Sequence, residues 1–168
     1  MAEDTPESGL PRKDHPDVVV HPPVLIAIVL VAALAIQWVW PLDPVAAFGS
    51  LAGRPLGGLL FAAGLGLAIW AVLAFRRAGT NVPTFQPTLA LVERGPYGHT
   101  RNPIYVSLIL AMIGLALLIG NAWLLLAAVP FALIVHFGVV KREESYLRGL
   151  FGAAYDDYCK RVPRWTGF

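Results

Sequence analysis

Four long apolar runs, each free of Asp, Glu, Lys and Arg, restrict the folds open to this chain. They cover residues 24–40, 56–75, 103–119 and 122–140. A helix of about 20 apolar residues crosses the roughly 30 Å hydrocarbon core of a bilayer. A soluble domain of 168 residues does not need 57% hydrophobic residues with only 14% charged ones. We therefore predict an all-α integral membrane protein with about four transmembrane helices, followed by a C-terminal amphipathic cytoplasmic helix.

The first part of the chain has a different composition. Residues 1–22 mix acids, bases and prolines, so we expect a flexible N-terminal tail. The apolar run that follows continues past the weak cleavage pattern at 33–35, which favours a retained anchor over a signal peptide. Residues 23–168 are then expected to form a single membrane domain.

Basic residues predict the orientation of these helices. The connection from Arg76 to Arg101 contains four arginines, and Lys141 and Arg142 follow the fourth run. The loop at 41–55 has one arginine and the turn at Gly120 has none. Because cytoplasmic loops carry the excess of Lys and Arg, both basic regions are expected on the cytoplasmic face, which is that of the inner membrane if the protein is bacterial.

A polar cluster at residues 94–105 separates two apolar runs. Pro96 favours a tight turn in which Gly98 adopts a positive φ. Asn102 is expected to cap the next helix with its side chain, and Pro103 to occupy the first helical position. Arginine and tyrosine side chains around such a helix start could surround a charged ligand, although they could also be interfacial anchors.

The C-terminal segment carries a second polar group. Glu143 and Glu144 follow two basic residues at the end of the fourth run, where a carboxylate is slightly disfavoured by the helix dipole. Either they serve a ligand site or they are solvated charges that balance the bases. Apolar residues then recur at three-and-four spacing, which predicts one amphipathic helix over about 141–162.

Other features point to packing. Gly57, Gly58, Gly64 and Gly66 in the second run favour close helix contact. Cys159 lies on an apolar helical stripe, so we expect it to pack rather than to react.

Four scattered histidines lack metal-ligand spacing, and a net charge of +2 is too small to suggest nucleic acid. We expect neither a metal nor a nucleic-acid partner.

An ordered set of motifs, from about residue 83 to 165, resembles a known family. The motifs are Gly95-Pro96-Tyr97, Arg101-Asn102-Pro103-Ile104-Tyr105, Glu143-Glu144, Phe151-Gly152, Tyr155, Tyr158 and Val162-Pro163-Arg164. Together they are similar to those of isoprenylcysteine carboxyl methyltransferases and their phospholipid methyltransferase relatives. Two positions depart from the pattern: Asn102 stands where eukaryotic members usually have His, and Ser107 where a Gly is frequent. Asn102 cannot act as a proton acceptor near neutral pH.

The resemblance implies an integral membrane enzyme that binds S-adenosyl-L-methionine on the cytoplasmic side, with the C-terminal helix closing over it. It also implies a hydrophobic or lipid-linked small-molecule acceptor that enters from the bilayer, with membrane lipids around the protein. On this interpretation Arg101 and Glu144 are the catalytic candidates. The implied cofactor-binding residues are Tyr97, Arg101, Asn102, Pro103, Tyr105, Glu143, Glu144, Tyr155, Tyr158 and Arg164.

The closest reaction by resemblance is carboxyl O-methylation of an isoprenylcysteine. Phospholipid N-methylation and methylation of a small thiol remain open, as does a membrane scaffold without catalytic activity. Membrane sterol reductases share related C-terminal patterns, but this chain is short for that larger set of helices.

Overall fold

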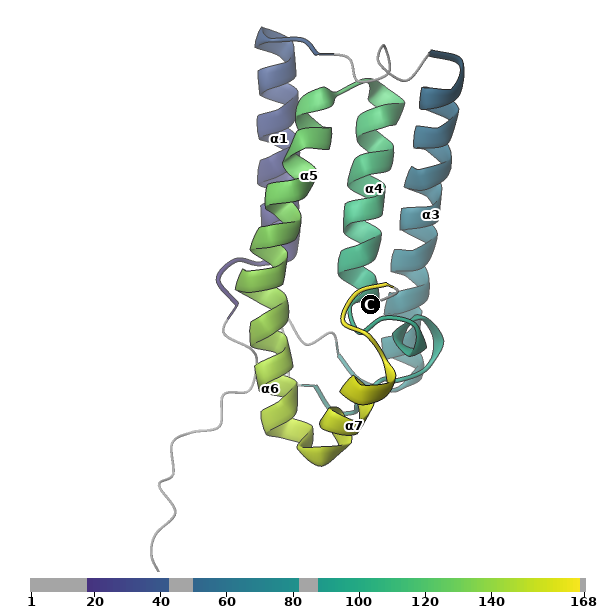
Figure 1. Ribbon diagram of the computed structural model, residues 1–168, viewed down its shortest axis with the longest axis vertical. Helices are drawn as coiled ribbons and strands as arrows, with labels where there is room; N and C mark the ends of the chain where they lie inside the picture. Colours follow the sequence, from purple (N-terminus) through teal and green to yellow (C-terminus); the bar gives the residue numbers. More distant parts are fainter. Residues whose placement is uncertain (1–17, 43–49, 82–87, 167–168) are drawn as a thin grey trace, which may run out of the picture.

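The computed structural model describes residues 18–42, 50–81 and 88–166, and this part of the chain is helical without β-strands (Figure 1). The long helices are α1 (Pro22–Val39), α3 (Ser50–Arg77), α4 (Pro103–Ile119) and α5 (Ala122–Val135). A π-helical turn, η2 (His136–Val140), continues α5 into α6 (Lys141–Phe151), and α7 (Ala153–Arg161) follows. A short 3₁₀ helix, η1 (Gly95–Gly98), precedes α4.

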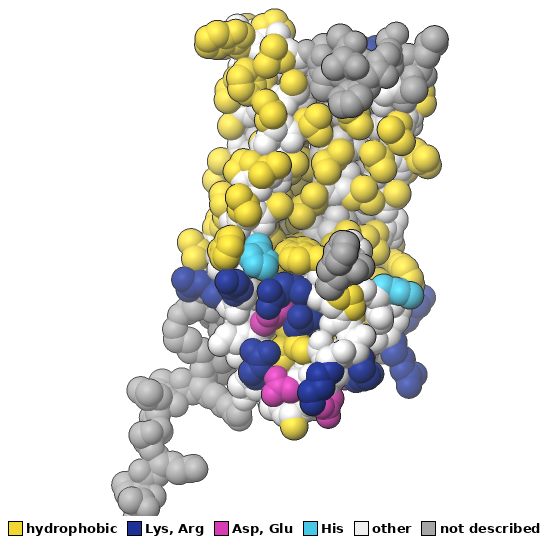
Figure 2. All heavy atoms as spheres, viewed as in Figure 1, with side chains coloured by type: hydrophobic (Ala, Val, Ile, Leu, Met, Phe, Trp, Pro, Cys, Tyr) yellow, Lys and Arg dark blue, Asp and Glu magenta, His cyan; other side chains and the backbone are white. Residues whose placement is uncertain are grey.

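Three helical stretches are long and apolar enough to cross a membrane: Pro22–Val39, Gly53–Arg77 and Ala122–Phe151. The third predicted run, residues 103–119, forms α4, which has 17 residues and is about 25 Å long. Figure 1 shows α4 extending alongside α3 and α5 in one bundle. In Figure 2 apolar side chains cover the sides of this bundle, and most of the visible charged side chains gather at the end that holds α6 and α7. The chain therefore has the surface of an integral membrane protein with one polar end.

Glycines allow α3 and α4 to approach closely. A Cβ atom at Gly57 would lie 2.5 Å from the Leu118 nitrogen, and one at Gly64 would lie 2.7 Å from the Ala111 nitrogen. Both distances are too short for a side chain, so the predicted helix contact is confirmed at these two positions. Gly66 is different, because a Cβ there would meet nothing within 4 Å.

The turn between α4 and α5 forms as predicted. Gly120 has φ +69°, and the Asn121 side chain accepts a hydrogen bond from the Leu124 amide at 2.8 Å. The Asn121 amide group also donates to the Ala33 carbonyl on α1 at 3.2 Å. One buried side chain thereby caps α5 and holds α1 against it.

Two local predictions were wrong. The positive φ before α4 belongs to Gly95 (φ +66°) and not to Gly98. Gly95 also lies close to Trp70, since a Cβ atom at Gly95 would be 3.4 Å from the indole nitrogen. The single helix predicted over 141–162 is instead two helices, α6 and α7, because Gly152 has φ +53°. This break turns α7 back toward the start of α4 (Figure 1).

Candidate active site

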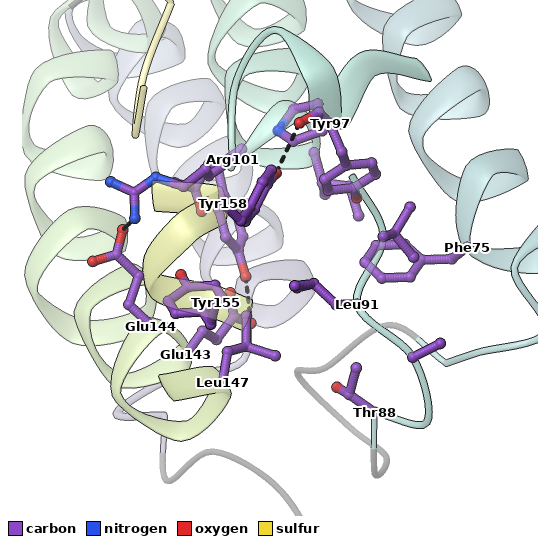
Figure 3. Close-up of a pocket in the computed structure, with 16 residues that line it drawn as sticks. Phe75, Thr88, Leu91, Tyr97, Arg101, Glu143, Glu144, Leu147, Tyr155 and Tyr158 are labelled. Atoms are coloured by element: carbon purple, nitrogen blue, oxygen red, sulfur yellow. Dashed lines mark hydrogen bonds and ion pairs between the residues drawn. The ribbon is translucent and has the colours of Figure 1, made fainter. Parts of the chain in front are cut away.

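A pocket that is partly open to solvent lies at the polar end of the bundle (Figure 3). The start of α4, helices α6 and α7, and the segment 88–92 form its walls. Its lining residues are Phe75, Thr88, Ala90, Leu91, Val92, Tyr97, Arg101, Asn102, Pro103, Ile104, Tyr105, Glu143, Glu144, Leu147, Tyr155 and Tyr158. Every predicted site residue except Arg164 is among them.

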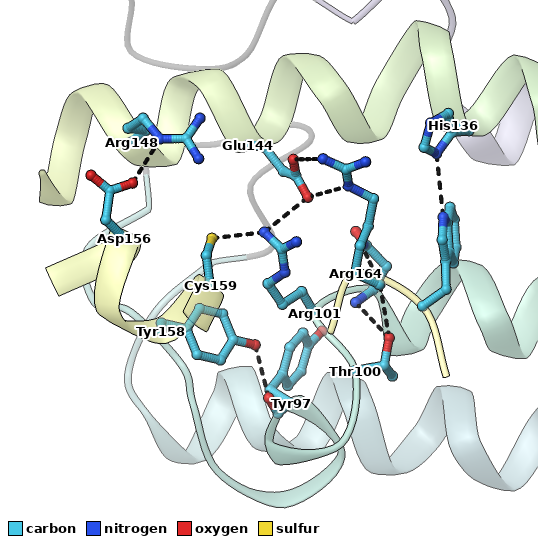
Figure 4. Close-up of polar contacts among 12 residues, drawn as sticks. Tyr97, Thr100, Arg101, His136, Glu144, Arg148, Asp156, Tyr158, Cys159 and Arg164 are labelled. Carbon is cyan, nitrogen blue, oxygen red and sulfur yellow. Dashed lines mark hydrogen bonds and ion pairs between the residues drawn. The ribbon is translucent and has the colours of Figure 1, made fainter. Parts of the chain in front are cut away.

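The Glu144 carboxylate is shared by two guanidinium groups (Figure 4). Arg164 donates to both of its oxygens at 2.8 Å, and Arg101 Nη1 lies 3.1 Å from Oε1. The side chain of Glu144 is only 8% exposed and that of Arg101 only 11%. Burial makes such charge-assisted bonds stronger than surface pairs, so this cluster fixes how α6 faces the start of α4.

Glu143 makes a separate contact beside this cluster. The Tyr105 hydroxyl donates to Glu143 Oε1 at 2.8 Å, and both residues are buried. The two adjacent glutamates of α6 thus reach different residues of the 94–105 segment. The interpretation of the two glutamates as solvated charges that only balance the bases is therefore wrong.

The side chain of Asn102 has another role than the one predicted for it. It makes no hydrogen bond that caps α4, and its Nδ2 donates instead to the Arg164 carbonyl at 2.9 Å. Thr100 Oγ1 donates to the same carbonyl at 3.0 Å, and the Arg101 amide donates to the Pro163 carbonyl at 3.0 Å. Three consecutive residues therefore hold the C-terminal segment in place. Pro103 does occupy the first turn of α4, as predicted.

Three tyrosines complete the walls. The Tyr158 hydroxyl donates to the Tyr97 carbonyl at 2.8 Å, and Tyr155 is 1% exposed. Burial raises the pKa of each of Tyr97, Tyr155 and Tyr158 well above the ordinary value of a tyrosine. All three hydroxyls stay protonated at neutral pH, so they can donate and accept hydrogen bonds but do not serve as bases.

Two buried polar atoms of the pocket residues lack a partner among the described residues: Arg101 Nε and Thr88 Oγ1. A buried unpaired donor costs about 1–3 kcal/mol, so natural sites usually satisfy it with a ligand or water. The pocket therefore suits a ligand that brings hydrogen-bond acceptors, including an anionic group for the guanidinium. No cluster of His, Cys, Asp or Glu able to hold a metal ion occurs in the described ranges.

The sequence did not reveal the apolar wall of the pocket. Phe75 comes from the end of α3, and Thr88, Leu91 and Val92 come from a connecting segment that has no recognisable motif. The sequence also missed a contact of Cys159, whose sulfur accepts from Arg101 Nη1 at 2.7 Å while the side chain packs against Tyr155 and Tyr158. Only the way the chain folds back brings these residues together.

Comparison with known proteins gives the family of the chain. A family model described as "Phospholipid methyltransferase" matches residues 53–154. An uncharacterized protein of Haemophilus influenzae is 36% identical over 62 residues, which are 37% of this chain and 98% of that protein. No solved structure matches.

Two relatives carry the name of an enzyme. The protein-S-isoprenylcysteine O-methyltransferase of Schizosaccharomyces pombe is 34% identical over 76 residues, which are 44% of this chain and 31% of that protein. Protein-S-isoprenylcysteine O-methyltransferase B of Arabidopsis thaliana is 32% identical over 81 residues, which are 46% of this chain and 40% of that protein. The chain thus spans less than half the length of either relative. Since the family model covers more than half of the chain, this protein belongs to the phospholipid methyltransferase family, which includes relatives of the isoprenylcysteine carboxyl methyltransferase type.

Proposed function

We propose that this protein is an S-adenosyl-L-methionine-dependent membrane methyltransferase that acts on a lipid-like acceptor, most like carboxyl O-methylation of an isoprenylcysteine. The observation that carries the proposal is the buried cluster of Glu144 with Arg101 and Arg164. It lies next to a pocket with an apolar wall and a guanidinium nitrogen that has no partner in the described part of the chain. Charged groups on one side and apolar groups on the other suit a cofactor that has an amino-acid end and an aromatic base.

Each residue has a role in this proposal. Arg101 Nε has no hydrogen-bond partner among the described residues and would meet the carboxylate of the cofactor, while Glu144 holds another nitrogen of the same guanidinium. Glu143 would accept from the cofactor's ribose hydroxyls or ammonium group. Tyr97, Tyr155 and Tyr158 shape the pocket, and Asn102 acts through the C-terminal segment that it holds. The cofactor supplies an electrophilic methyl group on a sulfonium.

The residues of the pocket favour an acceptor that needs no base. Methyl transfer to a carboxylate requires that both partners be positioned and water be excluded. The tyrosines are protonated, and Glu144 is already paired with two arginines. His99 is exposed and is not among the lining residues. For a thiol or a primary amine, Glu143 is the lining carboxylate left to take up the proton, and it already accepts from the Tyr105 hydroxyl.

The membrane geometry agrees with such an acceptor. We propose that α4 crosses the bilayer together with the three longer helices, which gives four spans and places the site on the cytoplasmic side. Arg76 and Arg77 end α3, and Lys141 and Arg142 begin α6 where it continues from α5, which agrees with the positive-inside rule for this side. A lipid-linked acceptor would enter sideways between helices and meet the water-soluble cofactor at the interface.

A second candidate is methylation of a phospholipid amine, which the description of the matching family favours. Incubating the purified protein with a labelled methyl donor and a panel of acceptors separates the two. We expect label in a prenylcysteine carboxylate, recognised by its release in base. Label in a phospholipid headgroup or in a small thiol would assign the alternative acceptor.

The first test of the proposal is cofactor binding. Calorimetric titration of the folded protein with S-adenosyl-L-methionine should show one site, and the variant Glu143→Gln/Glu144→Gln should lose it. Asp157→Asn is a matched control, since this exposed carboxylate pairs only with Lys160 in the described structure. A folded wild-type protein that does not bind the cofactor would leave only the scaffold interpretation.

A further inference from the structure

Thr88 is a buried pocket residue whose hydroxyl has no hydrogen-bond partner in the described part of the chain. The residue is 6% exposed, and its Oγ1 finds no donor or acceptor among the residues that the structure describes. Its backbone is well anchored, because the Thr88 amide donates to the Tyr146 hydroxyl at 3.4 Å and the next two amides both donate to Thr80 Oγ1. A valine would fill the same space without leaving a buried hydroxyl unpaired.

The position of Thr88 indicates which part of a ligand it would meet. Figure 3 shows it on the side of Phe75 and Leu91, across the pocket from Arg101 and Glu144. The charges of the pocket lie on the far side, and Ala90 and Val92 add apolar surface near Thr88 in the chain. A flat, uncharged group with a polar edge suits this end, whereas an amino-acid group suits the other.

We infer that Thr88 is a specificity residue for the nucleoside end of the bound cofactor. Its hydroxyl accepts a hydrogen bond from the exocyclic amino group on the polar edge of the adenine base, whose faces lie against the apolar wall. Arg101 Nε binds the carboxylate at the opposite end. The inference rests on the proposed function, because it assumes that this pocket holds S-adenosyl-L-methionine.

The test uses Thr88→Val and Thr88→Ser in the full chain, with S-adenosylhomocysteine as the calorimetric probe. Thr88→Val should bind the probe about three- to tenfold more weakly, and Thr88→Ser should bind nearly as well as the wild type, since one neutral hydrogen bond is removed or kept. Without ligand, Thr88→Val should unfold at the same temperature or a few degrees higher, because no bond of that hydroxyl is lost. A weaker affinity in a protein that is not destabilised separates ligand binding from a structural role.

A second probe locates the contact. An analogue of S-adenosylhomocysteine in which the base lacks its exocyclic amino group should bind the wild type and Thr88→Val with similar affinity. Equal loss with both probes would show that the hydroxyl meets another part of the ligand and would overturn the assignment to the amino group of the base. Wild-type binding with an unchanged Thr88→Val would overturn this inference alone, and a wild type that does not bind would overturn the proposed function as well.

Discussion

Replacing Glu144 by Gln removes the carboxylate that Arg101 and Arg164 share, and leaves two guanidinium groups side by side without a counter-charge. Arg101 is 11% exposed, so its part of the loss falls in the range of a broken buried pair, about 3 kcal/mol. Arg164 is 36% exposed, and water screens it, so we add no more than about 1 kcal/mol for it. Glu144→Gln should therefore lower the free energy of unfolding by about 3–4 kcal/mol.

The measurement is reversible unfolding of the purified protein in detergent micelles, followed by tryptophan fluorescence. Asp157→Asn is the control, and it should change the free energy of unfolding by less than about 0.5 kcal/mol because its ion pair is exposed. Adding Arg101→Gln to Glu144→Gln should recover part of the loss, since the orphaned charge is then removed. A cost below about 1 kcal/mol for Glu144→Gln, or no coupling with Arg101, would refute the view that this cluster joins α6 to the start of α4.

Three further predictions concern other parts of the fold. Gly64→Ala should destabilise the protein by about 1–3 kcal/mol, because the added methyl group would collide with the backbone of α4. Gly66→Ala is the control and should not destabilise it, since a Cβ there meets nothing within 4 Å. Thermal unfolding of both variants measures the difference. Asn102→Ala should loosen the C-terminal segment, and limited proteolysis should then cut near Arg164 more quickly than in the wild type. Because the pKa values of the buried tyrosines are raised, their contribution to stability is constant below about pH 10 and falls as the pH rises above it. Tyr97→Phe should make that alkaline fall shallower, and unfolding measured from pH 7 to 12 tests the sign.

The sequence by itself determined the class of the protein and much of its helical plan. Charge-free runs of this length cannot be left in water, and in a bilayer their backbone must be helical, so the membrane helices follow from composition and periodicity alone. The start of α4 at Pro103 and the turn at Gly120 and Asn121 are also local properties, set by backbone angles and one side-chain cap. The motifs that indicated the family lie in these same segments.

Only the tertiary structure decided how the site is assembled. Asn102 has the right identity to cap α4, but its side chain makes no cap, and its Nδ2 donates to the Arg164 carbonyl, 62 residues further along the chain. Cys159 and Thr88 carry no local signal, and the first reaches Arg101 because α7 turns back at Gly152. Periodicity predicts which face of a helix is apolar. It does not predict where the chain reverses or which distant group a polar side chain will meet. Those features depend on contacts between segments that are remote in sequence.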